Sequence, residues 1–221
     1  MRFPSRLTLV IAVLAFAVLA CSVPGLPSTP TLAPTAAPSG TVLFQDGFDS
    51  LLTGWDRVAA DGGVMDYDSG VFRIMVSVPD YNFWSTPGRQ FTDVRIEVDT
   101  ARLNGPDENR AGIVCRVNGE QFYFFVISSD GYYAVGKVNG EQVTLLGQEQ
   151  MQVSDTIRTG LAVNHLRADC VGSQLTFYIN GFPVAQAQDA TLPSGDVGLV
   201  AGTFDQPGAD IIFDQFIVMQ P

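Results

Sequence analysis

The sequence predicts an all-β fold built as a two-sheet antiparallel β-sandwich, and three observations support this class. Four apolar-rich runs lie between residues 111 and 146, separated by Asn118-Gly119, Asp130-Gly131 and Asn139-Gly140. Such pairs are a strong hairpin signal, because tight hairpin turns need a positive φ at their central residues. Gly, Pro, Asn and Asp also punctuate the rest of the domain at short intervals. No segment there shows the apolar stripe of an amphipathic helix.

Residues 1–21 are predicted to be a lipoprotein signal peptide with a signal helix, outside the folded domain. Arg2 and Arg6 give a positive start, and the charge-free apolar run Leu7–Ala20 is shorter than the roughly 20 residues of a membrane span. Val18–Cys21 resembles a bacterial lipobox, which implies that Cys21 is lipidated and becomes the mature N-terminus. The alternative is ordinary signal cleavage, with Cys21 incidental.

Residues 22–40 are predicted to be a disordered linker, and residues 41–221 the folded domain. The linker consists of Pro, Thr, Ala and Ser residues with few others and has no charge or periodicity. Such a segment buries too little surface to fold and acts as a semi-extended spacer. We therefore expect an extracytoplasmic domain whose partner is the bacterial cell membrane, reached through the N-terminal lipid.

The strands of the domain follow from alternation and from turn residues. In the run 91–102, Val94, Ile96 and Val98 alternate with charged residues, as in a half-buried antiparallel strand. The polar segment 148–155 is the one place where a short helical turn fits. The predicted strands cover residues 42–48, 71–78, 82–86, 91–102, the four runs of 111–146, then 157–166, the hairpin 175–187, 195–204 and 211–219.

The tight turns also predict which residues share a face of the sheet. A two-residue turn at Asn118-Gly119 places Val117 opposite Glu120 and Cys115 opposite Phe122. The predicted core face then carries Ile113, Cys115, Phe122, Phe124, Val126, Tyr133 and Val135. The other face carries Val114, Arg116, Gln121, Tyr123, Phe125, Ile127, Tyr132 and Ala134.

The second of these faces contains the candidate ligand-binding residues Arg116, Gln121, Tyr123 and Tyr132. Aromatic rings stack on the apolar faces of sugars, and arginine and glutamine side chains hydrogen-bond sugar hydroxyls. The alternative is that both faces are packed and that Arg116 pairs with a structural carboxylate.

Cys115 and Cys170 are the cysteines that remain once Cys21 is lipidated. An even pair outside the cytoplasm predicts a disulfide. There is no Cys-x-x-Cys motif, and the single histidine, His165, supports neither a zinc set nor a catalytic triad. The net charge of −11 argues against nucleic acid as a partner, because nucleic-acid binding requires a basic surface.

Several motifs in a fixed order resemble the concanavalin A-like lectin/glucanase superfamily. They are LFQDGFD, FTDVRIEVD, AGIVCR, QFYFFVISSDGYY, LTFYINGFPV, GDVGLVAG and IIFDQFIV, and they extend over residues 42–218. The resemblance is to laminin-G-like jelly rolls, including the type related to 3-keto-disaccharide hydrolases. It implies a two-sheet sandwich whose first and last strands pair, with one concave sheet that often binds glycans.

The resemblance also implies a cofactor and a comparison with catalytic relatives. Related jelly rolls hold a structural calcium ion where the first and last strands meet, which implies Asp46 and Asp214 as ligands. The alternative is that both aspartates cap turns. Retaining glucanases of this fold use an E-x-D-x-x-E motif, whereas here Glu97 and Asp99 are followed by Arg102 in place of the last glutamate. We therefore interpret these carboxylates as a solvated strand face.

Three functional hypotheses remain. The leading one is a lipid-anchored lectin-like module that binds carbohydrate or a cell-envelope partner without catalysis. The second is a hydrolase of the same fold acting on glycosides or modified disaccharides. The third is a structural or adhesion domain with no small ligand. A carboxylate with a strongly shifted pKa in a groove favours the enzyme, an aromatic-lined groove without one favours binding, and a covered sheet favours the structural role.

Overall fold

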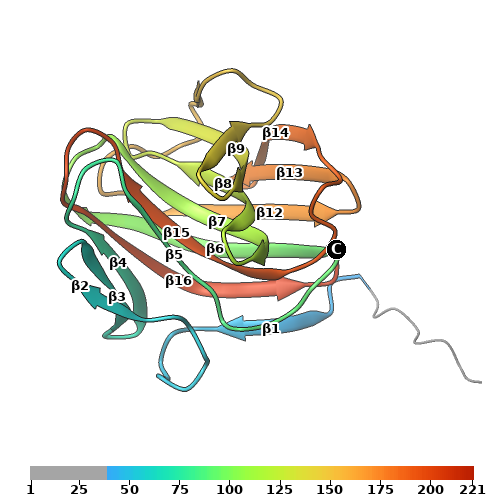
Figure 1. Cartoon of the computed structure of the whole chain (residues 1–221), viewed down its shortest axis with the longest axis horizontal. Helices are drawn as coiled ribbons and strands as arrows, with labels where there is room; N and C mark the ends of the chain where they lie inside the picture. The colour runs from blue at the N-terminus through green and yellow to red at the C-terminus, as the bar shows by residue number, and fades with distance from the viewer. Residues whose placement is uncertain (1–38) are drawn as a thin grey trace, which may run out of the picture. The chain divides into compact units, whose positions relative to one another are not determined.

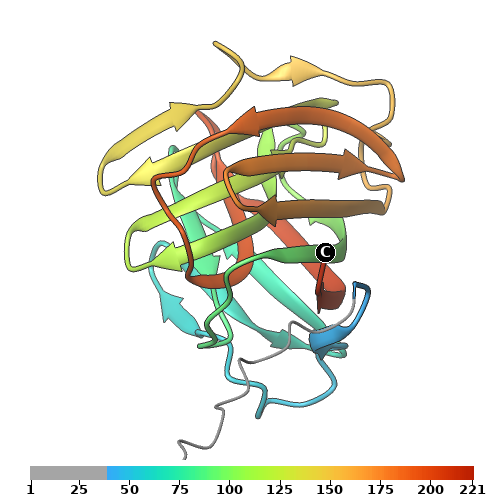
Figure 2. The same ribbon diagram turned by 90° about the vertical axis from the view of Figure 1, so that its right-hand side faces the viewer.

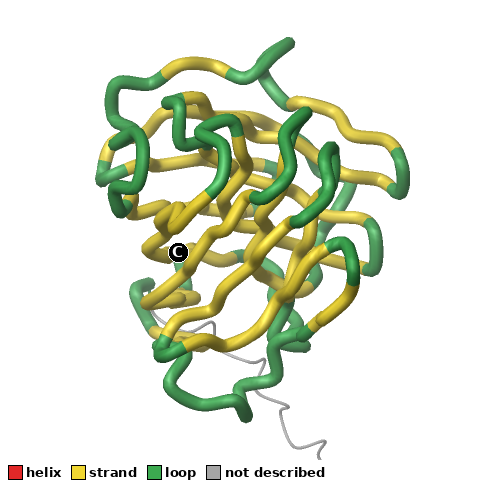
Figure 3. The backbone as a smooth tube through the Cα atoms, turned by 90° about the vertical axis from the view of Figure 1, so that its left-hand side faces the viewer, coloured by secondary structure: helices red, strands yellow, loops and turns green. Residues whose placement is uncertain are grey.

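Two antiparallel sheets stack face to face in the computed structural model of the protein, which describes residues 39–221 (Figure 1). The predicted all-β sandwich is confirmed. Residues 39–221 contain strands and loops only, as Figure 3 shows. Accordingly, no helix in this part of the chain is long and apolar enough to cross a membrane. Cys21 and the predicted signal peptide lie outside the described residues.

The first sheet has nine strands and includes both ends of the domain. Figure 2 shows its edge, where β12, β13 and β14 lie side by side. Strand β1 (Val42–Asp46) lies off the main order and pairs with β16. The order is β14 (Phe182–Gln188), β13 (Gln174–Ile179), β12 (Asn164–Val171), β6 (Val94–Asn104), β16 (Ala209–Met219), β4 (Val71–Val76), β3 (Gly63–Asp68) and β2 (Val58–Ala60).

The second sheet has seven strands and contains the meander that the turn residues predict. A short strand, β11 (Gln152–Val153), pairs with the start of β9. The order of the others is β10 (Gln142–Leu145), β9 (Tyr132–Asn139), β8 (Gln121–Ile127), β7 (Asn109–Asn118), β15 (Asp196–Thr203) and β5 (Asn82–Ser85).

The first and last strands pair, as the resemblance implies. Phe44 of β1 lies opposite Val218 of β16, and the amide of Gly40 donates to the carbonyl of Gln220 at 2.8 Å. Strand β16 therefore has β6 along one side and β4 followed by β1 along the other. The two ends of the domain lie next to each other (Figure 1).

The main core fills the space between the sheets. Alternate residues of β4, β6 and β12 point into it, and their burial patterns alternate as the sequence does. Burying one such aliphatic side chain stabilises the fold by about 1.5–3 kcal/mol. Fully buried aliphatic members include Ile74, Val98, Ile96, Ile113, Leu166, Leu199 and Ile211.

A cluster of aromatic rings explains the LFQDGFD motif. Asp46 is buried, and its carboxylate accepts hydrogen bonds from the indole Nε1 of Trp55 and from the backbone amide of Phe48, both at 2.8 Å. Phe48 adopts a positive φ of 58°, which turns its ring toward Trp55, with centroids 5.3 Å apart. The motif is therefore structural, since it fastens the loop after β1 onto the core.

The predicted disulfide is present. Cys115 of β7 is bonded to Cys170 of β12, and both residues are fully buried. Strand β7 belongs to the second sheet and β12 to the first, so the bond links the two layers. The prediction that Cys115 lies on the core face is also confirmed.

The predicted pairing of β7 with β8 is wrong by one residue. Cys115 lies opposite Tyr123 rather than Phe122, because a β-bulge interrupts the ladder between Cys115 and Asn118. Arg116 sits in this bulge with φ of 56°. A shift of one residue moves every side chain of a strand to the other face. Tyr123, Phe125 and Ile127 therefore belong to the core, while the side chains predicted there, Phe122, Phe124 and Val126, lie on the outer face.

Three other predictions need correction. No helical turn forms at 148–155, where the two-residue strand β11 lies instead. The strand predicted at 157–166 begins only at Asn164, because Asn164 and Asn180 use their side chains to fasten a loop. Strands β2 and β3, which are absent from the predicted strands, form a hairpin in which Ala60 lies opposite Gly63.

The outer face of the second sheet is covered by its own side chains. The buried members of this outer layer are Val114, Val117, Phe122, Phe124, Val126, Ala134 and Val200, and Trp84, Val138, Leu145 and Met151 pack against it. A Cβ at Gly136 would lie 2.2 Å from the ring of Phe124, so the glycine allows that ring to pack directly on the backbone of β9.

Candidate functional site

Two of the four predicted ligand residues are part of the protein interior. Arg116 is 2% exposed, and its guanidinium donates to the carbonyl of Leu192 at 2.8 Å and to Asp93 at 3.4 Å. Tyr123 is fully buried, and its hydroxyl donates to Asp189 Oδ1 at 2.6 Å. These contacts match the alternative in which Arg116 pairs with a structural carboxylate. The β-bulge is the physical reason, because it turns Tyr123 into the core.

The other two residues lie at the surface but apart from each other. Gln121 is exposed at one end of β8 and donates to Asn139 at 2.6 Å. Tyr132 is 39% exposed at the opposite end of the hairpin, at the start of β9. The structure therefore does not bring the four predicted residues together, and ligand binding at Gln121 and Tyr132 stays a prediction.

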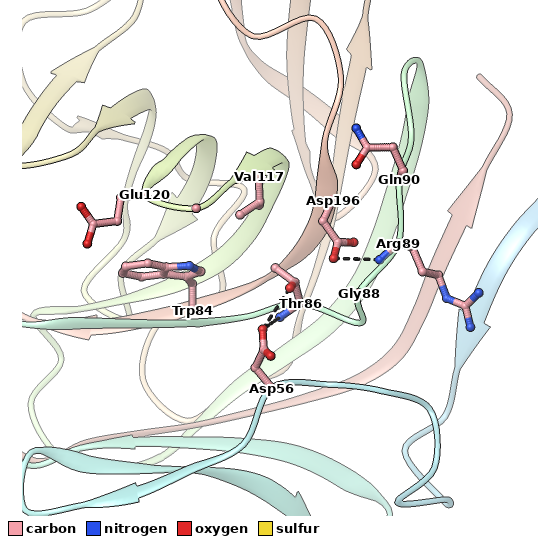
Figure 4. Close-up of a pocket in the computed structure, with 10 residues that line it drawn as sticks. Asp56, Trp84, Thr86, Gly88, Arg89, Gln90, Val117, Glu120 and Asp196 are labelled. Carbon is pink, nitrogen blue, oxygen red and sulfur yellow. Dashed lines mark hydrogen bonds between the residues drawn. The ribbon is translucent and has the colours of Figure 1, made fainter.

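A surface pocket lies at the end of the second sheet where β7 turns into β8. It has a volume of about 660 Å³. Four segments that are distant in the sequence form it, and Figure 4 shows how their side chains meet. The lining residues are Asp56, Trp84, Thr86, Gly88, Arg89, Gln90, Val117, Gly119, Glu120 and Asp196. We call this the Trp84 pocket.

Trp84 provides an aromatic wall of this pocket. Its ring packs on Phe122 of the outer layer, with centroids 5.2 Å apart, and it is only partly buried. Figure 4 shows the indole close to Val117 and Glu120 at the β7–β8 turn. A partly exposed indole supported from behind is a suitable stacking surface for a flat apolar ligand face.

Two aspartates hold the loop that forms the opposite wall. Asp196 accepts hydrogen bonds from the amides of Arg89 and Val197 at 2.9 and 2.8 Å. Asp56 accepts from the hydroxyl of Thr86 at 3.0 Å (Figure 4). The loop between β5 and β6 is therefore held at Thr86 and at Arg89, and the pocket is preformed.

The charged groups of the Trp84 pocket are mostly acidic. Asp56, Glu120 and Asp196 line it, and Arg89 is the one cationic residue among its lining residues. The Arg89 side chain points away, and its guanidinium lies 4.3 Å from the centroid of the Phe44 ring (Figure 4). Burial raises the pKa of Asp196, although the hydrogen bonds from backbone amides partly oppose this. The pocket thus offers acceptors and an aromatic surface, without a cation facing into it.

The Glu97-Val98-Asp99 segment lies elsewhere, on the outer face of the first sheet. His165 Nδ1 is 2.8 Å from Asp99, and its Nε2 is 3.6 Å from Glu97. The opposing residues in the ladder are Asp214 on one side of Asp99 and His165 on the other. These carboxylates therefore lie on a charged strand face, as predicted.

The residues proposed for calcium have other contacts. Both oxygens of Asp46 accept hydrogen bonds, and Oδ1 of Asp214 accepts from the backbone amide of Gln215 at 2.7 Å. Within residues 39–221, no cluster of three or more His, Cys, Asp or Glu side chains is arranged to hold a metal ion. The side chains thus supply no donor set around these two aspartates, and structural calcium stays a prediction.

Comparison with solved structures identifies the class of fold. No protein-family profile and no curated protein matches the sequence. A carbohydrate-binding module, CBM66, from Bacillus subtilis is 15% identical over 76% of this chain and 97% of its own, with a TM-score of 0.61. A Bacillus subtilis protein of unknown function with a galectin-like fold is 14% identical over 83% of this chain and 97% of its own, also with a TM-score of 0.61.

A third similar structure is an enzyme. The β-glucanase of Bacillus licheniformis is 11% identical over 83% of this chain and 100% of its own, with a TM-score of 0.55. The described domain thus has a jelly-roll fold like that of these structures, which confirms the fold that the resemblance implied. Identities this low establish the fold alone, and the function has to be argued from the site.

The sequence signals missed the Trp84 pocket. Trp84 is followed by Pro87-Gly88, which indicates a loop, but nothing in the sequence connects that loop with Glu120 or Asp196. The available signal was the tryptophan itself, because a tryptophan close to a loop is a candidate for stacking on a flat ligand face.

Proposed function

We propose that the protein is a non-catalytic carbohydrate-binding module that holds a neutral glycan in the Trp84 pocket. The observation that carries this proposal is a partly exposed indole in a preformed pocket, surrounded by Glu120, Gln90 and Thr86 as hydrogen-bonding groups. Sugars present apolar C–H faces to aromatic rings and hydroxyls to side-chain acceptors. Two of the structures with the same fold are a carbohydrate-binding module and a glucanase, which supports a glycan as the ligand.

The charge of the site supports a neutral rather than an anionic glycan. Asp56, Glu120 and Asp196 face the pocket, and the chain carries a net charge of −11. Like charges at a binding site disfavour a ligand both on approach and when bound. Uronic-acid polymers and phosphate-bearing wall polymers are therefore poor ligands under this proposal.

Hydrolysis is the second candidate, and the raised pKa of Asp196 is the observation in its favour. Glycosidases, however, need two carboxylates that are free to transfer a proton and to attack or activate water. Asp196 and Asp56 instead accept hydrogen bonds from the loop that they hold in place. That arrangement favours binding, because moving either carboxylate would release the pocket wall.

The test is a binding assay with the purified protein against neutral and anionic polysaccharides. Suitable probes are laminarin, xylan and mixed-linkage β-glucan, with alginate and polygalacturonate as anionic counterparts. The protein should bind at least one neutral polymer, and Trp84→Ala should weaken this binding at least about tenfold, equivalent to about 1.4 kcal/mol. The matched control is Phe182→Ala, an aromatic that is 62% exposed outside the pocket.

Because Trp84 also packs on Phe122, Trp84→Ala can weaken binding by destabilising the fold. A second variant separates this effect from the loss of a ligand contact. Glu120→Gln changes an exposed side chain and should reduce affinity without shifting the melting temperature. Equal affinity of wild type, Trp84→Ala and Glu120→Gln would overturn the proposed site. If the protein binds none of the neutral polymers, a structural or adhesion role is favoured. If it releases reducing sugar from them, the hydrolase is favoured.

The proposal includes the membrane anchor. The buried disulfide suits an oxidising compartment outside the cytoplasm, in agreement with a signal peptide and lipidation at Cys21. Metabolic labelling with an alkyne fatty acid should mark the wild type and leave Cys21→Ser unlabelled. A protein that is released unlabelled into the medium would contradict the anchor without affecting the glycan site.

A further inference from the structure

A second pocket, with a volume of about 400 Å³, also places aromatic side chains, one of them exposed, among hydrogen-bond acceptors. Its lining residues are Glu108, Ser128, Asp130, Tyr132, Gln150, Met151 and Phe204. Tyr132 is 39% exposed. We call this the Tyr132 pocket. It has the same combination as the Trp84 pocket, namely aromatic surface beside carboxylate and amide groups.

The aromatic wall of the Tyr132 pocket is held in place from behind. The guanidinium of Arg110 lies 3.7 Å from the centroid of the Phe204 ring. The same group donates to the carbonyl of Thr203 at 2.6 Å and to Asn82 at 3.1 Å. Ser128 is buried and donates to Asp130, which fixes that carboxylate at the turn. This second pocket is therefore also preformed.

Both pockets border the same outer layer of the second sheet. Trp84 and Val117 belong both to the layer and to the Trp84 pocket, and Met151 belongs both to the layer and to the Tyr132 pocket. The pockets lie at opposite ends of β8, one at Glu120 and the other at Ser128. At about 3.3 Å per residue in a strand, these positions are roughly 25 Å apart.

We infer that the two pockets are the end subsites of one extended site for a long, neutral polysaccharide chain. This inference rests on the proposed function of the Trp84 pocket and adds the length of the ligand. A short sugar fills one pocket, whereas a chain that reaches both gains the second contact without a second loss of translational freedom. Glu108 and Asp130 make the Tyr132 pocket acidic too, so the polysaccharide must lack anionic groups along its whole length.

The experiment measures affinity against chain length. Laminari-, xylo- and cello-oligosaccharides from disaccharides to octasaccharides are titrated calorimetrically into wild type, Trp84→Ala, Tyr132→Ala and Tyr132→Phe. For the series that binds, the longest members should bind wild type at least tenfold more tightly than disaccharides. Tyr132→Ala should remove this gain, so that its affinity no longer rises from the shortest to the longest members. Tyr132→Phe keeps the ring and should retain the gain.

The outcomes separate this inference from the proposed function. If Trp84→Ala weakens all ligands but Tyr132→Ala weakens none, the single-pocket module stands and the extended site is wrong. If affinity does not rise with length, the extended site is equally wrong. If neither variant changes binding, or if nothing binds, both proposals fail. Phe182→Ala is again the control, because Phe182 belongs to neither pocket.

Discussion

At the scale of single residues, Asp189 connects three segments of the chain. It follows β14, and its carboxylate accepts hydrogen bonds from Tyr123 of β8 at 2.6 Å and from the amide of Thr191 at 2.8 Å. Lys137 of β9 donates to its other oxygen at 2.7 Å. Burial works against ionisation, but hydrogen bonds from Lys137, Thr191 and Tyr123 outweigh it and hold the pKa of Asp189 well below its usual range.

This depressed pKa predicts a specific acid dependence of stability. A group whose pKa is lower in the folded protein stabilises it above the unfolded pKa, about 3.9 for aspartate, and loses that contribution as the pH falls toward the folded pKa. Asp189→Asn should therefore lower the free energy of unfolding by roughly 1–3 kcal/mol at neutral pH. The difference from wild type should shrink below about pH 4.

Urea unfolding across a pH series measures the effect. Asp205→Asn serves as the control, because Asp205 is an exposed carboxylate in a loop, and it should match wild type at every pH. A loss in Asp189→Asn that stays constant down to the most acidic pH would show that packing, rather than ionisation, is responsible.

Asp46 allows a second prediction at this scale. Asp46→Ala leaves the indole N–H of buried Trp55 and the amide of Phe48 without acceptors, so it should cost about 2–3 kcal/mol of stability. Asp214→Ala, at a partly exposed position, should cost less than about 0.5 kcal/mol. Equal losses in both variants, with a melting temperature lowered by chelator, would instead indicate a shared ion.

At the scale of elements, local turn chemistry explains which predictions held. The Asn180-Gly181 turn pairs Ile179 with Phe182, and both of its central residues have positive φ. The same turn rule gave the wrong register for the β7–β8 hairpin, because it did not anticipate the β-bulge at Arg116. In the sequence, Arg116 looks like an ordinary strand residue. Its strained backbone is compensated by tertiary contacts with Leu192 and Asp93, which no local pattern reveals.

The link between β7 and β12 is testable at this scale. The Cys115–Cys170 bond spans 55 residues of chain, and closing a loop of that size removes entropy worth about 4 kcal/mol from the unfolded state. The double variant Cys115→Ala with Cys170→Ala should lose stability of this order in guanidinium unfolding. A reducing agent added to the unfolded wild type should reproduce the loss on refolding. A double variant as stable as wild type would show that packing alone holds the layers.

At the scale of the whole molecule, the sequence predicted the architecture better than the site. Strands and their core faces depend on alternation and turns, which are local. The Trp84 pocket depends on Asp56, Trp84, Glu120 and Asp196, which the topology brings together from four separate segments. The disulfide was predictable because the domain contains two cysteines, Cys115 and Cys170, and these allow one pairing. By contrast, many arrangements of aromatic and acidic residues are compatible with the same strands.

The pairing of β1 with β16 brings the first and last residues of the domain next to each other. Because Gly40 and Gln220 are hydrogen-bonded neighbours, a short peptide could join the two ends and new ends could be opened at an exposed turn such as Asn139-Gly140. For the same reason, the domain can be spliced into a surface loop of a host protein with little separation of the host's cut ends.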